Sequence, residues 1–141
     1  MTNSEKKYSV LIVEDDPGDQ FLLQNAIAEI DQAINIDQLY TGRQVVEFLL
    51  KDKVYFDLNR QEIPDLIIAN VKADFFWLDD LQEIRKYKEF NRIPIYLFSA
   101  YESELFKNKA LELGATGFYK KPYTFLDLKY ILNSILNRVA A

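Results

Sequence analysis

Short apolar runs alternate with longer segments of helical periodicity along most of the chain, and this alternation constrains the fold more than any other feature. Each run is rich in leucine, isoleucine, valine or aromatic residues, as expected for a buried strand. The runs occupy residues 8–13, 34–40, 65–70, 93–98 and 116–119. Strands that alternate with helices in this way predict an α/β protein with a right-handed, doubly wound parallel sheet.

Capping residues indicate where the helices between these runs begin. Asp16 before Pro17 is typical of an N-cap and the first helical residue, and we interpret Asp16 as a cap rather than a metal ligand. Thr41 and Gln44 match a capping box, and Thr124 is placed to cap the last helix. The third and fourth helices are predicted to cover residues 76–89 and 102–113, with Leu81, Ile84 and Tyr87 toward the core and Gly114 just past the fourth helix.

The chain is predicted to form one domain. Its 141 residues contain no repeat, low-complexity tract or linker, so we expect a single core over about residues 8–139. A polar, irregular stretch at 51–63 is predicted to be a loop.

The chain contains no histidine and no cysteine, which excludes several classes of function. Ser-His-Asp and Cys-His nucleophiles, disulfides and metal sites built from His or Cys are ruled out. With 17 basic and 22 acidic residues the formal charge is −5, which argues against nucleic-acid binding. No apolar run is long enough to span a bilayer, so we expect a cytoplasmic protein without membrane contact. Any chemistry must rely on carboxylates, hydroxyls, amides, lysines or a hard metal ion.

Polar residues follow four of the predicted strands. Glu14 and Asp15 come after the first strand, and Asn70 ends the third. Ser99 follows the fourth strand, and Lys121 lies beyond the fifth. Because ligands of open α/β sheets bind beyond the carboxyl ends of the strands, these side chains are expected to converge at one edge. The two adjacent carboxylates there would suit Mg²⁺.

Four sequence fragments, in order and at matching intervals, make the chain resemble the CheY-like receiver domains of two-component response regulators. They are VLIVEDDPGD at 10–19, PDLII at 64–68, RIPIYLFSA at 92–100 and ELGATGFYKKPY at 112–123. The resemblance covers essentially the whole chain and implies a flavodoxin-like (βα)5 fold with strand order 2-1-3-4-5. It also implies a stand-alone, non-enzymatic protein of phosphorelay signal transduction, with a sensor kinase or a downstream effector as its partner.

The same resemblance assigns roles to individual residues. Glu14 and Asp15 match the acidic pair that holds Mg²⁺ in the family. Ser99 and Lys121 match the hydroxyl and the lysine of the phosphoryl pocket. Phe118 matches the aromatic residue that rotates when such domains switch.

Asn70 stands where the family has its phosphoacceptor aspartate. A carboxylate can attack phosphorus and form an acyl phosphate, whereas a neutral amide is a poor nucleophile. With one negative charge fewer, Mg²⁺ held by Glu14, Asp15 and the Asn70 amide should bind only weakly. Lys121 loses its carboxylate partner and is expected to turn toward Glu14 or Asp15. The chain is therefore predicted to be a degenerate receiver, or pseudo-receiver, that acts by protein contacts without aspartyl phosphorylation.

Two alternatives stay open at this point. One is a working Mg²⁺-dependent receiver that uses a displaced acceptor such as Asp74. The other is a flavodoxin-like domain that binds a small ligand, or a hydrolase, with Glu14, Asp15 and Lys121 as its polar groups. No glycine-rich phosphate loop follows the first strand, which argues against the second alternative.

Aromatic residues indicate where protein partners would bind. The chain has 10 Phe, 9 Tyr and 1 Trp, and two clusters exceed what a core requires. One cluster is the Phe-Phe-Trp run at 75–77, and the other surrounds the fourth and fifth βα units and includes Tyr101 and Tyr123. We expect one cluster to form a protein contact, in one version a homodimer through the fourth and fifth units.

Overall fold

The computed structural model describes residues 8–50, 63–72, 76–101 and 103–140, which form a five-stranded parallel sheet in the order β2-β1-β3-β4-β5. The strands are β1 (Ser9–Val13), β2 (Asn35–Leu39), β3 (Leu66–Asn70), β4 (Ile95–Ser99) and β5 (Gly117–Lys120). The helices are α1 (Pro17–Ile30), α2 (Gly42–Leu49), α3 (Phe76–Arg85), α4 (Glu104–Glu112) and α5 (Phe125–Ala140), with a 3-10 helix at Lys88–Phe90. This topology confirms the predicted flavodoxin-like fold and its strand order.

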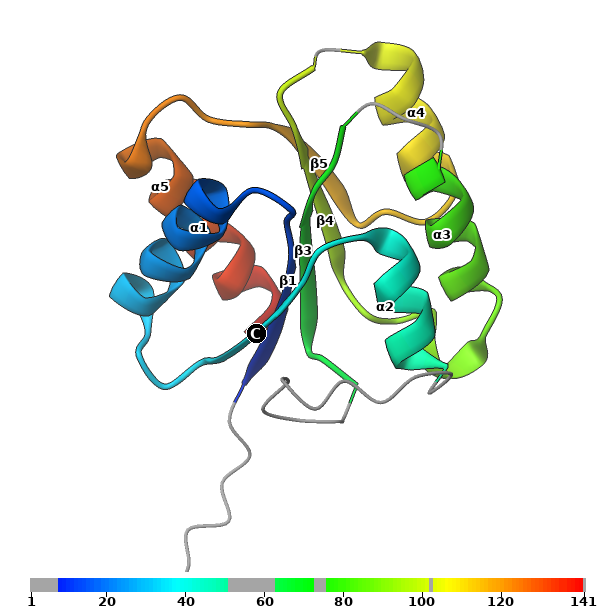
Figure 1. Ribbon diagram of the computed structural model, residues 1–141, viewed down its shortest axis with the longest axis horizontal. Coiled ribbons are helices and arrows are strands. Elements are labelled where there is room, and N and C mark those ends of the chain that lie inside the picture. The colour runs from blue at the N-terminus through cyan, green and yellow to red at the C-terminus, as the bar shows by residue number, and fades with distance from the viewer. Residues whose placement is uncertain (1–7, 51–62, 73–75, 102, 141) are drawn as a thin grey trace, which may run out of the picture.

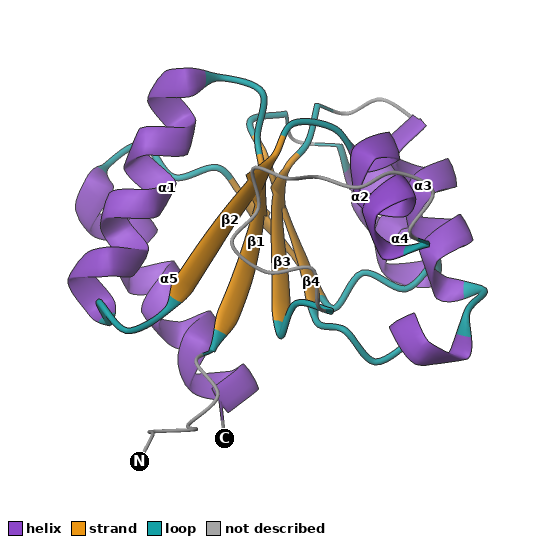
Figure 2. Ribbon diagram, turned by 60° about the horizontal axis from the view of Figure 1, so that its bottom comes forward, coloured by secondary structure: helices purple, strands orange, loops and turns teal. Residues whose placement is uncertain are grey.

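Helices cover both faces of the sheet, with α1 and α5 on one face and α2, α3 and α4 on the other (Figure 1, Figure 2). Successive side chains of a strand point to opposite faces, so each central strand contributes to both cores. In β3, Leu66 and Ile68 pack toward α1 and α5, whereas Ile67 and Ala69 pack toward α2, α3 and α4. All four are completely buried, which explains the continuous apolar character of this strand. None of the described helices is both long enough and apolar enough to cross a membrane.

The predicted caps form the starts of α1, α2 and α5. A carboxylate oxygen of Asp16 accepts a hydrogen bond from the backbone N–H of Asp19 at 2.9 Å, as an N-cap should. Thr41 and Gln44 make both hydrogen bonds of a capping box, and the Thr124 hydroxyl caps α5. Because α1 begins directly after the residues that follow β1, its first turn lies at the same edge of the sheet as the strand ends.

The third helix is shorter than its periodicity predicts. It ends at Arg85, and Tyr87 is exposed on the surface instead of facing the core. The backbone of Tyr87 is extended, with φ −95° and ψ 128°, which takes the chain out of the helix. The Arg85 guanidinium then donates hydrogen bonds to the carbonyl oxygens of Phe90, Ile93 and Gly114 at 2.7, 2.8 and 3.0 Å. These three bonds hold the segment after the helix against the end of α4.

The fourth helix begins at Glu104 rather than at residue 102. The Ser103 hydroxyl accepts a hydrogen bond from the backbone N–H of Phe106 at 3.2 Å and so caps the helix at this point. Gly114 follows the helix with φ 116°, a left-handed conformation that favours glycine, as predicted for the residue just past a helix.

Candidate functional site

The carboxyl ends of four strands bring the predicted polar residues to one edge of the sheet. Glu14 follows β1, Asn70 is the last residue of β3, Ser99 is the last residue of β4, and Lys121 follows β5. A cleft of about 440 Å³ lies at this edge, lined by Glu14, Asn70, Lys121 and their neighbours. The predicted convergence is therefore confirmed for these three residues. Ser99 is instead fully buried beneath the cleft.

Asn70 and Glu14 form the central contact of the site. The Asn70 side-chain amide donates a hydrogen bond to one carboxylate oxygen of Glu14. The other oxygen accepts a hydrogen bond from the backbone N–H of Asp16 at 3.0 Å. The Glu14 side chain is buried, with 3% of its surface exposed, and burial raises the pKa of this carboxyl above its ordinary value of 4.5, although both hydrogen bonds oppose the shift. The backbone N–H of Asp16 and the Asn70 amide thus both favour the charged form of Glu14 against the effect of burial.

Asp15 and Lys72 lie on the outer side of the same cleft. The Lys72 ammonium is 3.8 Å from a carboxylate oxygen of Asp15, and both side chains are exposed. Such an exposed pair contributes little to stability, but it places a positive charge next to the more accessible of the two adjacent acids.

Lys121 pairs with Asp19, and the expectation that it turns toward Glu14 or Asp15 is wrong. Its ammonium forms an ion pair and hydrogen bond with a carboxylate oxygen of Asp19 in the first turn of α1. The reason is geometric, because Glu14 is already held by Asn70 and the backbone, whereas α1 directs Asp19 toward the loop after β5. The Asp16-x-x-Asp19 spacing puts a second acid in the first helical turn beside the cap, but this spacing alone does not single out Asp19 among the acids at this edge.

The remaining predicted positions surround the cleft. The Ser99 hydroxyl accepts a hydrogen bond from the backbone N–H of Tyr101 at 3.1 Å, which fixes the turn after β4. Phe118, on β5, is partly buried and meets the Phe106 ring edge-on, with the ring centres 5.8 Å apart. Trp77 is buried and Phe76 is exposed, whereas Asp74 and Phe75 lie outside the described residues.

The acidic side chains Glu14 and Asp15 already have partners within the protein. Both oxygens of Glu14 already accept hydrogen bonds, and a lysine stands beside Asp15. Within the described parts of the chain, no group of three or more acidic side chains is arranged to hold a metal ion. Mg²⁺ is normally bound through carboxylate oxygens with retained waters, so binding here would have to displace internal partners.

A sheet of this topology with acids, an amide and a lysine at its carboxyl edge defines a CheY-like α/β signalling domain. The family model of the response regulator receiver domain matches residues 10–133, and the chain belongs to this family. It is accordingly a receiver domain of two-component signalling.

Individual relatives agree with this assignment. The probable transcriptional regulator ycf29 of Porphyra purpurea is 29% identical over 133 residues, which cover 93% of this chain and 57% of that protein. The chain spans about half the length of the curated relatives it matches. Among solved structures, the phosphorylated cyanobacterial phytochrome response regulator RcpA is 22% identical, with a TM-score of 0.80 and 96% of each chain covered. The Mn²⁺-bound response regulator Rcp1 is 23% identical, with a TM-score of 0.73 and 92% of each chain covered. At these identities the two structures support the fold.

Proposed function

We propose that this receiver domain is a pseudo-receiver, which occupies about residues 8–139 and transmits signals in the cytoplasm through protein contacts without aspartyl phosphorylation. It is not an enzyme in this proposal, and its partners are a sensor kinase or a downstream effector. One observation carries the proposal: the residue at the carboxyl end of β3 is Asn70, and its amide is engaged with Glu14. An amide in that position cannot supply the carboxylate nucleophile that an acyl phosphate requires.

The charges at this edge support the proposal. The Asn70 amide and the backbone N–H of Asp16 bond to Glu14, and Lys121 binds Asp19. These internal contacts replace part of the role that a metal ion plays in neutralising adjacent acids. Glu14, Asp15 and the Asn70 amide are the residues that would hold Mg²⁺, and we propose that they hold it weakly.

Phosphorylation chemistry tests the proposal. The protein is incubated with acetyl phosphate and Mg²⁺, and intact-mass spectrometry measures the added phosphoryl group. We expect the wild type to stay unlabelled and Asn70→Asp to become labelled, because the substitution restores a carboxylate at the end of β3. Asp74→Ala serves as the second variant. Labelling of the wild type that disappears in Asp74→Ala would instead establish the displaced-acceptor alternative.

The proposed contact surface surrounds the edge strand β5. Exposed apolar side chains gather there from the loop after β4, from α4, and from the loop and helix that follow β5; they are Tyr101, Leu105, Tyr123, Leu126 and Tyr130. Most single exposed apolar residues need no explanation, but several near one edge strand are typical of an interaction site. We assign this surface to protein contacts, with a homodimer as its simplest form.

Light scattering tests the homodimer. We expect a dimer mass at high micromolar concentration, and Leu126→Glu, which places a charge on a side chain that is 76% exposed, should return the mass to that of a monomer. Phe76→Glu is the matched control, because Phe76 is 80% exposed and belongs to α3, which contributes none of the residues named for this surface. A wild type that stays monomeric at millimolar concentration excludes the homodimer.

A further inference from the structure

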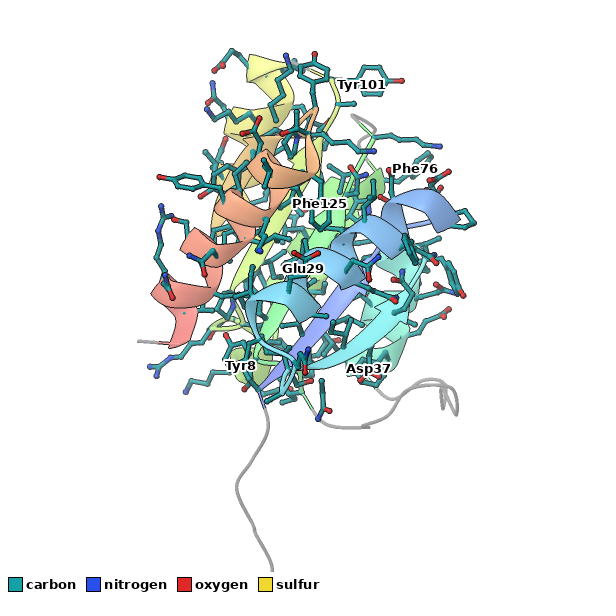
Figure 3. All side chains as sticks on the ribbon, turned by 90° about the vertical axis from the view of Figure 1, so that its left-hand side faces the viewer. Tyr8, Glu29, Asp37, Phe76, Tyr101 and Phe125 are labelled. Atoms are coloured by element: carbon teal, nitrogen blue, oxygen red, sulfur yellow. The ribbon has the colours of Figure 1, made fainter. Side chains whose placement is uncertain are left out.

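A small apolar pocket lies between α1 and the start of α5, next to the acidic cleft. Its volume is about 100 Å³, and its apolar wall comes from both helices and two strands: Leu22, Leu23, Ile68, Phe98, Phe125 and Leu128. Figure 3 is viewed from this side of the molecule, where Phe125 lies between the ribbons of α1 and α5. The function proposed above gives no role to this apolar wall, although Asn70, Lys121 and Tyr123, which it does use, also line the pocket.

The size of the pocket limits what can occupy it. An apolar cavity of about 150 Å³ is large enough to hold a benzene molecule. A pocket of about 100 Å³ is smaller than this, but because it opens to the surface, part of a ring or a branched alkyl group can enter it while the rest of the ligand stays outside. It is too small for the backbone of a peptide segment, so an occupant enters through a single apolar group.

The charged residues at the opening of the pocket indicate which ligand charge is favoured. Asp19, Asn70 and Lys121 line both the apolar pocket and the neighbouring cleft, so the two spaces adjoin at these residues. The cleft is lined by four carboxylates, those of Glu14, Asp15, Asp16 and Asp19, and by two lysines, Lys72 and Lys121. An organic cation is attracted to this excess of negative charge, and an organic anion is repelled.

We propose that this pocket binds a small organic amine, with its apolar ring among the side chains of α1 and α5 and its ammonium group in the acidic cleft. The ring replaces water against Leu22, Ile68 and Phe125, which supplies the hydrophobic part of the affinity. The ammonium accounts for selectivity over neutral and acidic analogues of the same shape.

An NMR titration of the full 141-residue chain tests the pocket. Benzylamine, benzyl alcohol and benzoate are the probes, because they share one ring and differ in charge. We expect saturable amide shifts at Leu22, Asn70 and Phe125, with benzylamine binding about tenfold more tightly than benzoate and benzyl alcohol in between. Equal binding of the three probes, or shifts that do not saturate at millimolar concentrations, would overturn the proposal.

Two matched tryptophan variants and one charge variant locate the site. Leu22→Trp fills the pocket from a position that is 43% exposed, so the helix can accept the larger ring, and benzylamine should lose at least about tenfold in affinity. Phe21→Trp makes a similar change on the same helix at a side chain that is 66% exposed and does not line the pocket, so its binding should match the wild type. Asp19→Asn should weaken benzylamine and strengthen benzoate. Unchanged binding in both Leu22→Trp and Asp19→Asn would place the probes elsewhere and refute the assignment.

Discussion

Asn70→Asp is expected to destabilise the metal-free protein by about 2 kcal/mol at neutral pH, because it removes a hydrogen bond to a charged group and adds a second carboxylate beside a buried one. In the wild type, the Asn70 amide donates to Glu14, whose side chain is almost completely buried. The variant puts two acceptors where a donor and an acceptor now meet. Urea denaturation of wild type and variant measures the difference in the free energy of unfolding.

The loss of stability in Asn70→Asp, relative to the wild type, should increase with pH. Burial already raises the pKa of Glu14 above its ordinary value of 4.5, so between that value and the raised pKa the folded state binds more protons than the unfolded state. Stability therefore falls as pH rises through this window. The new carboxylate raises the pKa of Glu14 further and makes the fall steeper. We expect the difference from the wild type to be smallest at acidic pH, where Glu14 is protonated, and to increase as the pH rises through the raised pKa of Glu14.

Mg²⁺ should reverse much of this loss, because a cation that binds only the folded state stabilises it by mass action. Two control variants separate the effect of the lost hydrogen bond from the effect of the added charge. Asn70→Ala removes the hydrogen bond without adding charge and should respond little to Mg²⁺. Asn91→Asp adds the same charge at an exposed residue and should leave stability nearly unchanged. A variant Asn70→Asp as stable as the wild type without metal would mean that the hydrogen bond from Asn70 to Glu14 does not stabilise the fold.

Arg85→Met should cost about 3 kcal/mol of stability, since three backbone carbonyl oxygens lose their shared donor at once. The guanidinium is partly buried, and burial lowers the pKa of Arg85, yet a guanidinium stays protonated at neutral pH. Methionine has a similar length and keeps the packing of the stem, so the loss reports mainly on the hydrogen bonds. Thermal and urea unfolding measure it.

Arg85→Lys and Arg43→Met test whether the loss of stability comes from the three hydrogen bonds to carbonyl oxygens. Lysine keeps the charge, but a single ammonium cannot reach the carbonyl oxygens of Phe90, Ile93 and Gly114 together, so an intermediate loss is expected. Arg43 forms an exposed ion pair with Glu83 at 3.4 Å, and its replacement should cost less than about 0.5 kcal/mol. Equal losses in Arg85→Met and Arg43→Met would show that the three carbonyl bonds do not stabilise the fold.

Local rules in the sequence were sufficient to place the strands and the starts of α1, α2 and α5, whereas the strand order was predicted from the resemblance to receiver domains. Leu66, Ile67 and Ile68 form an uninterrupted apolar run because β3 is covered by helices on both faces. Asp16, Thr41 and Thr124 mark helix starts because each caps backbone N–H groups within the first turn. These interactions span only a few residues, so they can be predicted without the tertiary structure.

Two predictions, the end of α3 and the partner of Lys121, were wrong. Both depend on contacts between segments that lie apart in the sequence. The periodicity of α3 continues to Tyr87, but the helix ends at Arg85, whose guanidinium binds carbonyl oxygens from the segment after the helix and from Gly114. The partner of Lys121 was likewise predicted incorrectly, because Asp19 is 102 residues away in the chain. No local pattern records which of several acids at an edge a lysine will reach.

The sequence by itself determined the α/β class, the edge at which polar residues gather, and the replacement of a carboxylate by the amide of Asn70. These conclusions depend only on residue identity and on the spacing of apolar residues along the chain. Only the tertiary structure decided that Asn70 donates to Glu14, that Lys121 binds Asp19, and that an apolar pocket opens beside them. The physical reason is that hydrogen bonds and ion pairs depend on distances of a few ångströms between side chains, and those distances exist only after the strands and helices have packed.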